Sequence, residues 1–236
     1  MHILEQYSLT TGLKVNKPFI EENYFPLPFK DKKYITVDNN IVIPSRFYDF
    51  WADVAEDIGK DFVKNDIHIV QIGDEKDPII PGSYDVRAVT TSTQEAYIIK
   101  NSLLHVGSND FHVDIASFFD VPVVALYGST YSSIAKPFWG NRDAQVFLES
   151  DRDGRKPSFS QQEDKKSINL IKPEEISQAI FKLLRIKPSI ATKNTLYTGS
   201  LYAHYTLEIV PDHAPPPDFS TNLPINLRMD YHYDLN

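Results

Sequence analysis

The chain has 236 residues, of which 42% are hydrophobic and 24% are charged, and its formal net charge is −8. This composition predicts a globular protein with a real hydrophobic core, and the acidic balance without a basic cluster argues against an electrostatic nucleic-acid binder. The sequence contains no cysteine, which excludes disulfides, cysteine-ligated zinc sites and a thiol nucleophile.

The first 33 residues predict an irregular arm. One short helical turn around Ile3–Tyr7 is followed by proline–aromatic breaks at Lys17–Phe19 and Phe25–Phe29. Such arms usually lie in a surface groove. Because an acidic residue, Glu5, stands near the start and no long apolar run follows, we expect no signal peptide, no membrane span and a cytoplasmic location.

Strands and helices then alternate. A strand is predicted over Lys33–Val37, and it ends in the polar run Asp38–Asn40. From Ser45 to Phe62, apolar residues recur at helical spacing and predict one helix with a single buried face. The apolar run Ile67–Ile72 predicts the next strand.

A loop rich in proline, glycine and aspartate follows, and Val86–Val89 is predicted as a short strand. Ser92 and Glu95 have the spacing of a capping box, in which a serine and a glutamate three residues later satisfy each other's free amides. We therefore expect a helix from Ser92 to about Lys100, with Glu95 acting mainly as a capping residue.

The next segment has the pattern of a βαβ unit. The apolar run Leu103–Val106 is followed by a small polar loop, a short helical pattern at 113–120 and a second apolar run, Val121–Tyr127. Polar residues stand at the carboxyl ends of both predicted strands. In open α/β sheets this edge binds ligands, and the amino end of a helix there favours anions.

Beyond Gly140 the sequence predicts a strand at Ala144–Leu148, a charged loop over 151–166 and a helix that begins at Pro173. Strands that alternate with helices at this spacing predict an α/β fold, with a Rossmann-like parallel sheet covered by helices on both faces. We expect this domain to span residues 34–185, after the arm of residues 1–33.

Residues 186–236 differ in character, with a strand-like run at Leu201–Val210 and a proline-rich break at Ala214–Asp218. We expect an extended, β-like carboxyl-terminal arm that packs on its own domain or on a neighbouring subunit. Asp230, His232 and Asp234 would share one face of a strand, as ligands of some metal sites do. This pattern is too weak to assign a metal site.

Candidate ligand-binding residues lie at the carboxyl ends of the predicted strands: Asp38, Asn39, Ser108, Asn109, Asp110, His112, Asp114, Ser129 and Thr130. Each has an alternative structural role. Asn109 or Asp110 would cap the following helix, His112 would be either a proton-transfer group or a packed side chain, and Ser129–Thr130 would form a turn.

Three sequence blocks form one extended motif. They are Leu103-Leu-His-Val-Gly-Ser-Asn-Asp110, Ile115-Ala-Ser-Phe-Phe-Asp-Val-Pro-Val-Val-Ala-Leu-Tyr-Gly-Ser-Thr130 and Pro137-Phe-Trp-Gly140. Together they resemble a motif of heptosyltransferase-like glycosyltransferases. These enzymes belong to glycosyltransferase family nine and have the GT-B fold. The resemblance covers roughly residues 34–185. It implies the carboxyl-terminal half of such an enzyme, which binds a nucleotide sugar as its substrate and uses no other cofactor.

Several positions depart from the family pattern. The family has an Asp-Ser/Thr-Gly trio where this chain has Asn109-Asp110-Phe111, and a helix histidine where this chain has Asp114. A phenylalanine in place of glycine would crowd a diphosphate, and added carboxylates would repel it. Residues 1–33 resemble only the connector between the two GT-B halves. The half that carries the acceptor site and the usual catalytic base is therefore expected to be missing.

Two hypotheses follow. In the first, the chain is a glycosyltransferase-related, nucleotide-sugar-binding half, which transfers sugar with inversion if another domain or chain completes it. In the second, it is a non-catalytic module that binds partner proteins or assembles with itself through residues 1–33 and 186–236. The sequence assigns no catalytic residue and leaves open whether the chain is an enzyme.

Overall fold

The computed structural model describes residues 1–29, 33–39, 41–189, 207–209, 220 and 225–227. The chain divides into two units, Met1–Thr195 and Leu196–Asn236. The finer division predicted from the sequence, at residues 33/34 and 185/186, stays a prediction.

Six parallel strands form the sheet of the first unit, in the order β3-β2-β1-β4-β5-β6. The strands are β1 (Lys33–Asp38), β2 (Ile67–Ile72), β3 (Tyr84–Asp85), β4 (His105–Ser108), β5 (Val123–Tyr127) and β6 (Gln145–Glu149). Central strands are buried on both faces because helices cover each side, which explains their continuous apolar runs. The predicted Rossmann-like α/β fold is confirmed.

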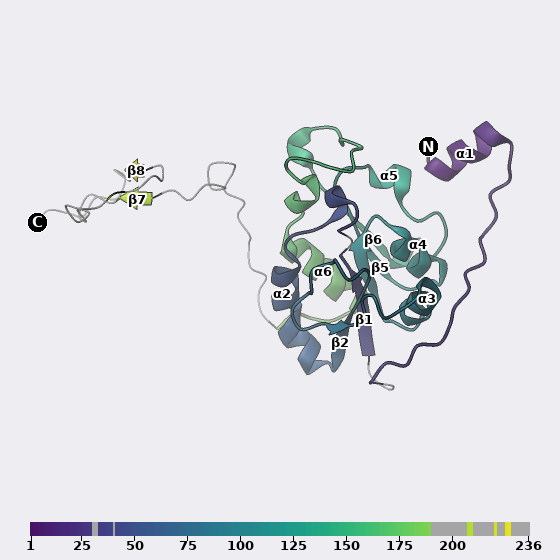
Figure 1. The fold of residues 1–236 in the computed structure, drawn as a ribbon, viewed down its shortest axis with the longest axis horizontal. Coiled ribbons are helices and arrows are strands. Elements are labelled where there is room, and N and C mark those ends of the chain that lie inside the picture. The colour runs from purple at the N-terminus through teal and green to yellow at the C-terminus, as the bar shows by residue number, and fades with distance from the viewer. Residues whose placement is uncertain (30–32, 40, 190–206, 210–219, 221–224, 228–236) are drawn as a thin grey trace, which may run out of the picture. The chain divides into compact units, whose positions relative to one another are not determined.

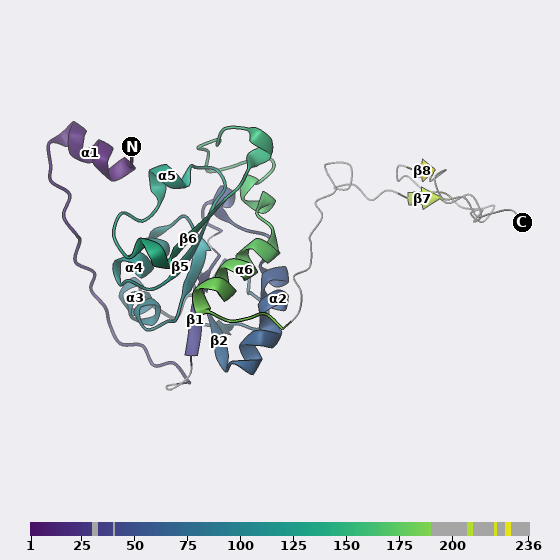
Figure 2. The same ribbon diagram turned by 180° about the vertical axis from the view of Figure 1, so that it is seen from behind.

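Helices cover both faces of this sheet (Figures 1 and 2). On one face lie α2 (Trp51–Lys64) and α6 (Pro173–Leu184), whose apolar side chains share a core with Ile35 and Val37 of β1. On the other face lie α3 (Ser92–Lys100) and α4 (Phe111–Phe118). The alternation of side chains along β1 thus supplies both cores, while Thr36 and Asp38 face the α3/α4 side.

The remaining elements are short. In the first unit they are α1 (Ile3–Thr11), α5 (Ser132–Ala135) and the 3₁₀ turns η1 (Pro44–Arg46), η2 (Arg142–Ala144), η3 (Arg152–Gly154) and η4 (Ser167–Leu170). In the second unit β7 (Leu207–Ile209) pairs in parallel with β8 (Ile225–Leu227). Within the part of the chain that the structure describes, no helix is long and apolar enough to cross a membrane.

The predicted start of the long helix at Ser45 is wrong, because α2 begins at Trp51. Two backbone amides in between are bound by side chains instead: the amide of Tyr48 donates to Asn39 Oδ1 at 3.3 Å, and that of Asp49 donates to Asn169 Oδ1 at 3.1 Å. These bonds hold the chain out of helical geometry. From Trp51 onward the predicted buried face is present.

The predicted capping box of α3 is displaced by one residue. Thr91, not Ser92, is the N-cap, and Gln94, not Glu95, is its reciprocal partner. Since several neighbouring hydroxyl residues can each cap a helix, the sequence alone leaves this register open. The displacement frees Glu95, which is only 6% exposed, from the capping role that the sequence predicted.

Two predicted strands are shifted as well. The short strand lies at Tyr84–Asp85 instead of Val86–Val89, where Ala88 takes a left-handed backbone conformation (φ 58°). Strand β4 covers His105–Ser108, two residues later than the predicted apolar run at Leu103–Val106. The hydrogen-bonded strand therefore continues into the small polar residues that the sequence suggested were a loop.

The amino-terminal arm packs along the α3/α4 side. The amide of Asn23 donates to the carbonyl of Thr93 at 3.0 Å, and Glu22 forms an ion pair with Lys100. Phe25 and Phe29, both partly buried, pack against the core of that face. The aromatic residues that flank Pro26 and Pro28 thus supply contacts that hold the arm to the sheet domain.

Gly128→Ala is expected to destabilise the fold by about 1–3 kcal/mol, the usual cost of overpacking. A Cβ atom at Gly128 would lie 2.5 Å from the backbone nitrogen of Ile168, in the core beside β5. Chemical denaturation followed by circular dichroism measures the change. The control is Gly59→Ala in α2, where a Cβ has nothing within 4 Å, and it should stabilise by up to about 1 kcal/mol. Equal stability of the two variants would contradict the argument.

Candidate functional site

The connections reverse direction between β1 and β4. After β1 the chain continues to β2 on one side of the sheet, and it returns to β4 on the other side. A crevice at the carboxyl ends of the strands is the usual ligand site at such a switch point. Asp38 ends β1 and Asp110 follows β4, so both lie at this place.

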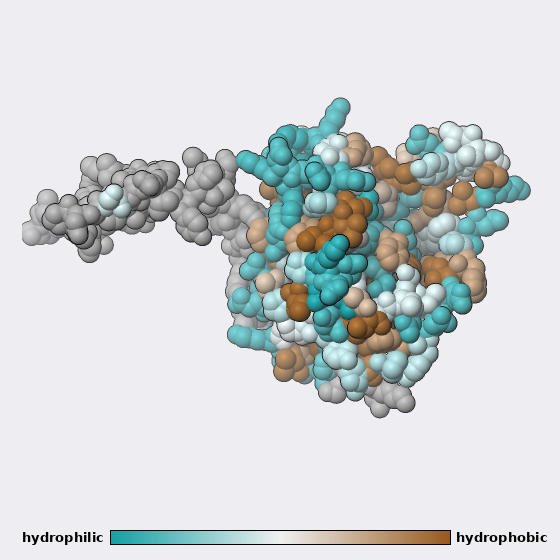
Figure 3. Space-filling model, viewed as in Figure 1, coloured by the Kyte–Doolittle hydropathy of each residue, from teal (hydrophilic) through white to brown (hydrophobic). Residues whose placement is uncertain are grey.

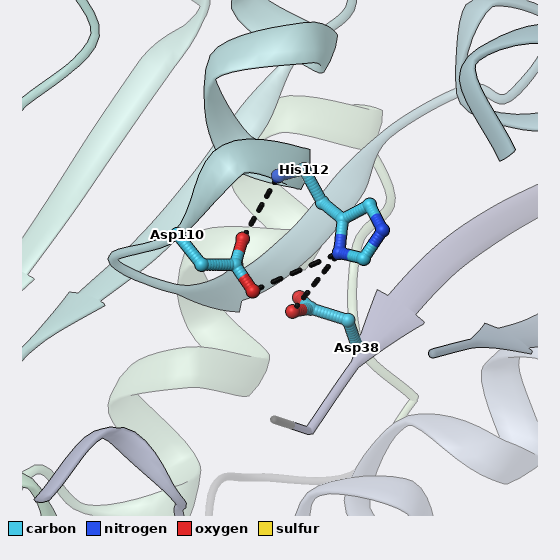
Figure 4. Close-up of side chains that lie close together, drawn as sticks. All are labelled: Asp38, Asp110 and His112. Carbon is cyan, nitrogen blue, oxygen red and sulfur yellow. Dashed lines mark hydrogen bonds and ion pairs between the residues drawn. The ribbon is translucent and has the colours of Figure 1, made fainter. Parts of the chain in front are cut away.

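Asp38, Asp110 and His112 point toward one another at the switch point (Figure 4). Asp110 is the N-cap of α4, and its Oδ1 accepts the backbone amide of His112 at 2.9 Å. The ring Nδ1 of His112 lies 3.4 Å from Asp38 Oδ2 and 3.7 Å from Asp110 Oδ2. Capping of the helix by Asp110 thus places the imidazole of the first turn between two carboxylates.

Two further buried residues complete the cluster. The other ring nitrogen of His112, Nε2, lies 3.1 Å from Glu95 Oε2 on α3. His105 on β4 lies with Nε2 3.4 Å from Asp38 Oδ1, and its Nδ1 is 3.0 Å from the hydroxyl of Thr36. Three carboxylates and two imidazoles therefore share one buried site on the α3/α4 side of the sheet.

Burial and mutual charge shift the pKa values of these groups. Burial, reinforced by the nearby charge of Asp38, raises the pKa of Asp110 to about 6. Burial opposes a charge on His112, but its bonds to Asp110, Asp38 and Glu95 outweigh this effect and raise its pKa well above the usual range. Burial, together with the charge of His112, lowers the pKa of His105 to about 3. The site therefore holds a charged His112 beside a neutral His105.

Gly107 makes room for the carboxylate of Asp38. The two residues lie next to each other on paired strands, and a Cβ atom at Gly107 would overlap the Asp38 carboxylate and lie 3.1 Å from His105 Nε2. A side chain at this position would displace Asp38 from His112. The glycine of the predicted motif is thus explained by the packing of a charged group, not by a special backbone angle.

A pocket of about 300 Å³ opens beside the cluster. Four of its lining residues are acidic, Asp38, Asp74, Asp77 and Glu95, and His112 lines it too. The ring of Phe111, which is 48% exposed, packs on that of His112 with centroids 3.9 Å apart and forms part of the rim. Among the described residues that line the pocket there is no lysine or arginine, so its field is unfavourable for a bare anion.

The other predicted site residues lie elsewhere. Asn39 accepts the amide of Tyr48, and the buried hydroxyl of Ser129 donates to Ser45 at 3.1 Å, so each has a partner outside the cluster. Asp114 lies exposed on α4.

Three more predicted residues have backbone or packing roles in the structure. The amide of Asn109 donates to the carbonyl of Leu126, and the carbonyl of Thr130 accepts from Arg152. Ser108 is buried, and its hydroxyl has no hydrogen-bond partner among the described residues. Of the nine predicted residues, the structure brings Asp38, Asp110 and His112 into one cluster. Asp230, His232 and Asp234 fall outside the described residues.

Sequence reasoning missed Glu95 and His105. Glu95 shares its helix face with the buried Ile98 and Ile99, so an acidic residue at i, i+3, i+4 spacing from apolar ones was a usable signal. His105 stands inside an apolar strand run, where an imidazole is buried with a polar partner. Titratable residues on apolar helix or strand faces thus indicate this site better than the polar residues of the predicted loops do.

Neither a protein-family model nor a curated protein matches the sequence. Solved structures do match. The chain is similar to a family 9 glycosyltransferase from Veillonella parvula (14% identity, TM-score 0.51, 77% of this chain and 50% of that one). It is also similar to the iron-containing dodecameric glycosyltransferase TibC from enterotoxigenic E. coli (11% identity, TM-score 0.56, 74% and 52%).

TibC has also been solved in complex with ADP-D-β-D-heptose (12% identity, TM-score 0.52, 66% of this chain and 46% of that one). At such low identities these likenesses show the fold alone. The chain spans about half the length of the structures it matches. The predicted resemblance to heptosyltransferase-like GT-B proteins is thus confirmed at the level of the fold.

Proposed function

We propose that residues 34–185 form the nucleotide-sugar-binding half of a glycosyltransferase-like protein, with the ligand in the pocket beside Asp38 and His112. The observation that carries this proposal is the position of the pocket, at the switch point of a sheet whose fold is shared with glycosyltransferases. TibC, which has this fold, is known in complex with a nucleotide sugar.

The lining favours the hydroxyl-bearing part of such a ligand. Carboxylate oxygens accept hydrogen bonds from ribose or sugar hydroxyls, and Asp74, which is exposed and lines the pocket, is placed to supply them. The exposed face of Phe111 offers an apolar surface for a sugar ring or a base. The acidic lining is less suited to a diphosphate, which belongs outside the pocket or requires a compensating cation.

Sugar transfer needs more than this half. The family resemblance implies that the acceptor site and the catalytic base come from another domain or chain, so we assign no catalytic residue within residues 34–185. The inverting outcome and a cytoplasmic location both stay predictions.

Calorimetry with a panel of nucleoside diphosphates and nucleotide sugars tests the proposal. We expect at least one nucleotide sugar to bind at millimolar concentration or below, more tightly than its nucleoside diphosphate, because the pocket recognises hydroxyls. Phe111→Ala should weaken this binding about 2–10-fold, because it removes one aromatic contact with the ligand. Phe159→Ala, at an exposed phenylalanine outside the pocket lining, is the matched control. The absence of binding across the panel would reject the donor-site proposal.

A second candidate function, a non-catalytic interaction module, is favoured by the surface of the amino-terminal segment. Tyr7, Leu9, Leu13 and Phe19 are 58–91% exposed, although all are large and apolar. Hydrophobic and hydrophilic side chains are interspersed over the face of the molecule seen in Figure 3. Apolar side chains concentrated on one segment are typical of a protein-binding surface.

Light scattering after size exclusion tests this second candidate. The full chain should be larger than a monomer or retain a partner, and the double variant Leu9→Asp and Phe19→Asp should lose that association. A chain truncated after Ser189 examines the carboxyl-terminal arm while sparing the hydrogen bonds of Ser189 to Asp61 on α2. If all three proteins are monomers without a partner, the module hypothesis fails.

A further inference from the structure

His112 presents both ring nitrogens to carboxylates. Nε2 lies 3.1 Å from Glu95 Oε2, while Nδ1 lies 3.4 Å from Asp38 Oδ2 and 3.7 Å from Asp110 Oδ2. A neutral imidazole has one N–H donor and one lone pair. If the only ring proton is on Nε2 toward Glu95, the lone pair of Nδ1 faces two carboxylate oxygens, so either a second ring proton, as in the charged form of His112, or a metal ion has to lie between these three atoms.

The spacing of the three atoms fits a metal ion. Two ligand atoms that are each about 2.1 Å from a tetrahedral ion lie about 3.4 Å apart. The distances of Nδ1 from Asp38 Oδ2 and Asp110 Oδ2 are close to this value, and donor atoms of all three residues lie within 4.8 Å of one another. Small side-chain rotations would bring them around one ion.

The surroundings of His112 are those of a metal ligand. A histidine that binds a metal usually donates its other N–H to a carboxylate, which fixes the orientation of the ring. Glu95, only 6% exposed, is in position to accept this N–H, and Glu95 Oε1 in turn accepts the hydroxyl of Thr90 at 3.2 Å. The Glu95 carboxylate thus has a defined role once Nδ1 binds an ion.

Asp38 supplies an independent indication. Its side chain is 1% exposed, and its Oδ1, although 3.4 Å from His105 Nε2, forms no hydrogen bond with the described residues. A buried carboxylate oxygen without a hydrogen bond is costly in the absence of a cation nearby. Since Asp38, Glu95 and Asp110 are all acidic, one divalent cation would offset two of their charges.

We propose that Asp38, Asp110 and His112 bind one divalent transition-metal cation such as Mn²⁺, Fe²⁺ or Zn²⁺. Two carboxylates and one imidazole match the preferences of these ions better than those of Ca²⁺, which prefers six to eight oxygen ligands. The inference does not require the chain to bind a nucleotide sugar. The ion would occupy the base of the acidic pocket and reduce its negative charge.

Titration of the chelator-treated full-length chain with Mn²⁺, followed by electron paramagnetic resonance, tests the site. We expect one bound ion per chain, displaced by Zn²⁺. Asp38→Asn and His112→Gln should each weaken binding at least tenfold, and Glu95→Gln should weaken it about 10–100-fold through the orientation of His112. His68→Gln is the matched control, because the partly buried His68 lies 3.9 Å from Asp66 near the start of β2, apart from the cluster, and its replacement should leave metal binding unchanged.

A second measurement on the unmodified chain keeps the test independent of how the variants fold. Bound Mn²⁺ should broaden the amide NMR signals of Asp110 and His112 before those of Asp66 and His68. The proposal is overturned if the unmodified chain binds no ion, if broadening begins elsewhere, or if folded Asp38→Asn and His112→Gln proteins bind as tightly as the unmodified chain.

Discussion

Asp110→Asn is expected to make the metal-free protein more stable at pH 8, by up to roughly 3 kcal/mol, and to leave its stability at about pH 4 almost unchanged. Burial and the charge of Asp38 raise the pKa of Asp110 from 3.8 to about 6. Asparagine has no such charge and caps a helix as well as aspartate does, so α4 keeps its first turn.

The direction of this pH dependence follows from the number of protons that Asp110 binds in the folded and in the unfolded chain. Below about pH 4 Asp110 is protonated in both states and contributes no difference. As the pH rises from 3.8 to about 6, the unfolded chain releases this proton while the folded chain retains it, so the wild-type protein loses stability. Above about pH 6 the full cost of a buried charge persists in the wild-type protein, and the uncharged asparagine of the variant avoids that cost.

Urea unfolding of both proteins between pH 4 and 8, in the presence of a chelator, measures the difference. The exposed Asp164→Asn substitution on the loop before η4 controls for the general loss of one negative charge. A difference between wild type and Asp110→Asn that is the same at both ends of this pH range would contradict the explanation. If the metal proposal holds, the stabilised variant also binds Mn²⁺ more weakly, since function and stability then compete at this residue.

Phe62→Ala is expected to destabilise the protein by about 3–5 kcal/mol, which is a large share of the stability of a typical domain. Phe62 is 2% exposed and lies in the core between α2 and α6, in the same cluster as Ile176 and Ile180. Removal of its ring takes away buried apolar surface and leaves a cavity that the packed helices fill only in part.

The neighbouring residue provides the control. Val63 follows Phe62 on α2 but is 84% exposed, so Val63→Ala should change the unfolding free energy by less than about 0.5 kcal/mol. Chemical denaturation of both variants gives the comparison. Similar losses in the two variants would mean that helix propensity, and not burial of one face, sets the stability of α2.

Local sequence patterns predicted the architecture because each depends on neighbouring residues alone. Apolar side chains at Val54, Ile58 and Phe62 repeat with the period of a helix, and the runs at β2 and β5 are apolar throughout because both faces of the sheet are covered. The cap at Asp110 was also predictable, since the residue stands directly before a helical pattern.

Element boundaries were less predictable where distant side chains bind the backbone. Helix α2 begins six residues later than expected because Asn39 and Asn169 bind the amides of Tyr48 and Asp49. Asn169 lies 120 residues further along the chain than Asp49, so no short stretch of the sequence contains both partners of this hydrogen bond. In α3, Thr91 and Ser92 are equivalent as caps, and packing selects Thr91.

Local patterns in the sequence are enough to predict a parallel α/β sheet with helices on both faces and acidic residues at the ends of β1 and β4. The sequence also indicated the family of folds, through a motif that spans the β4–α4–β5 unit. Only the tertiary structure decided which polar residues meet. Glu95 joins His112 because α3 and α4 pack side by side, and His105 faces Asp38 because β4 pairs with β1 in that register. These contacts join segments that are far apart in the chain, so neither spacing nor composition could reveal them.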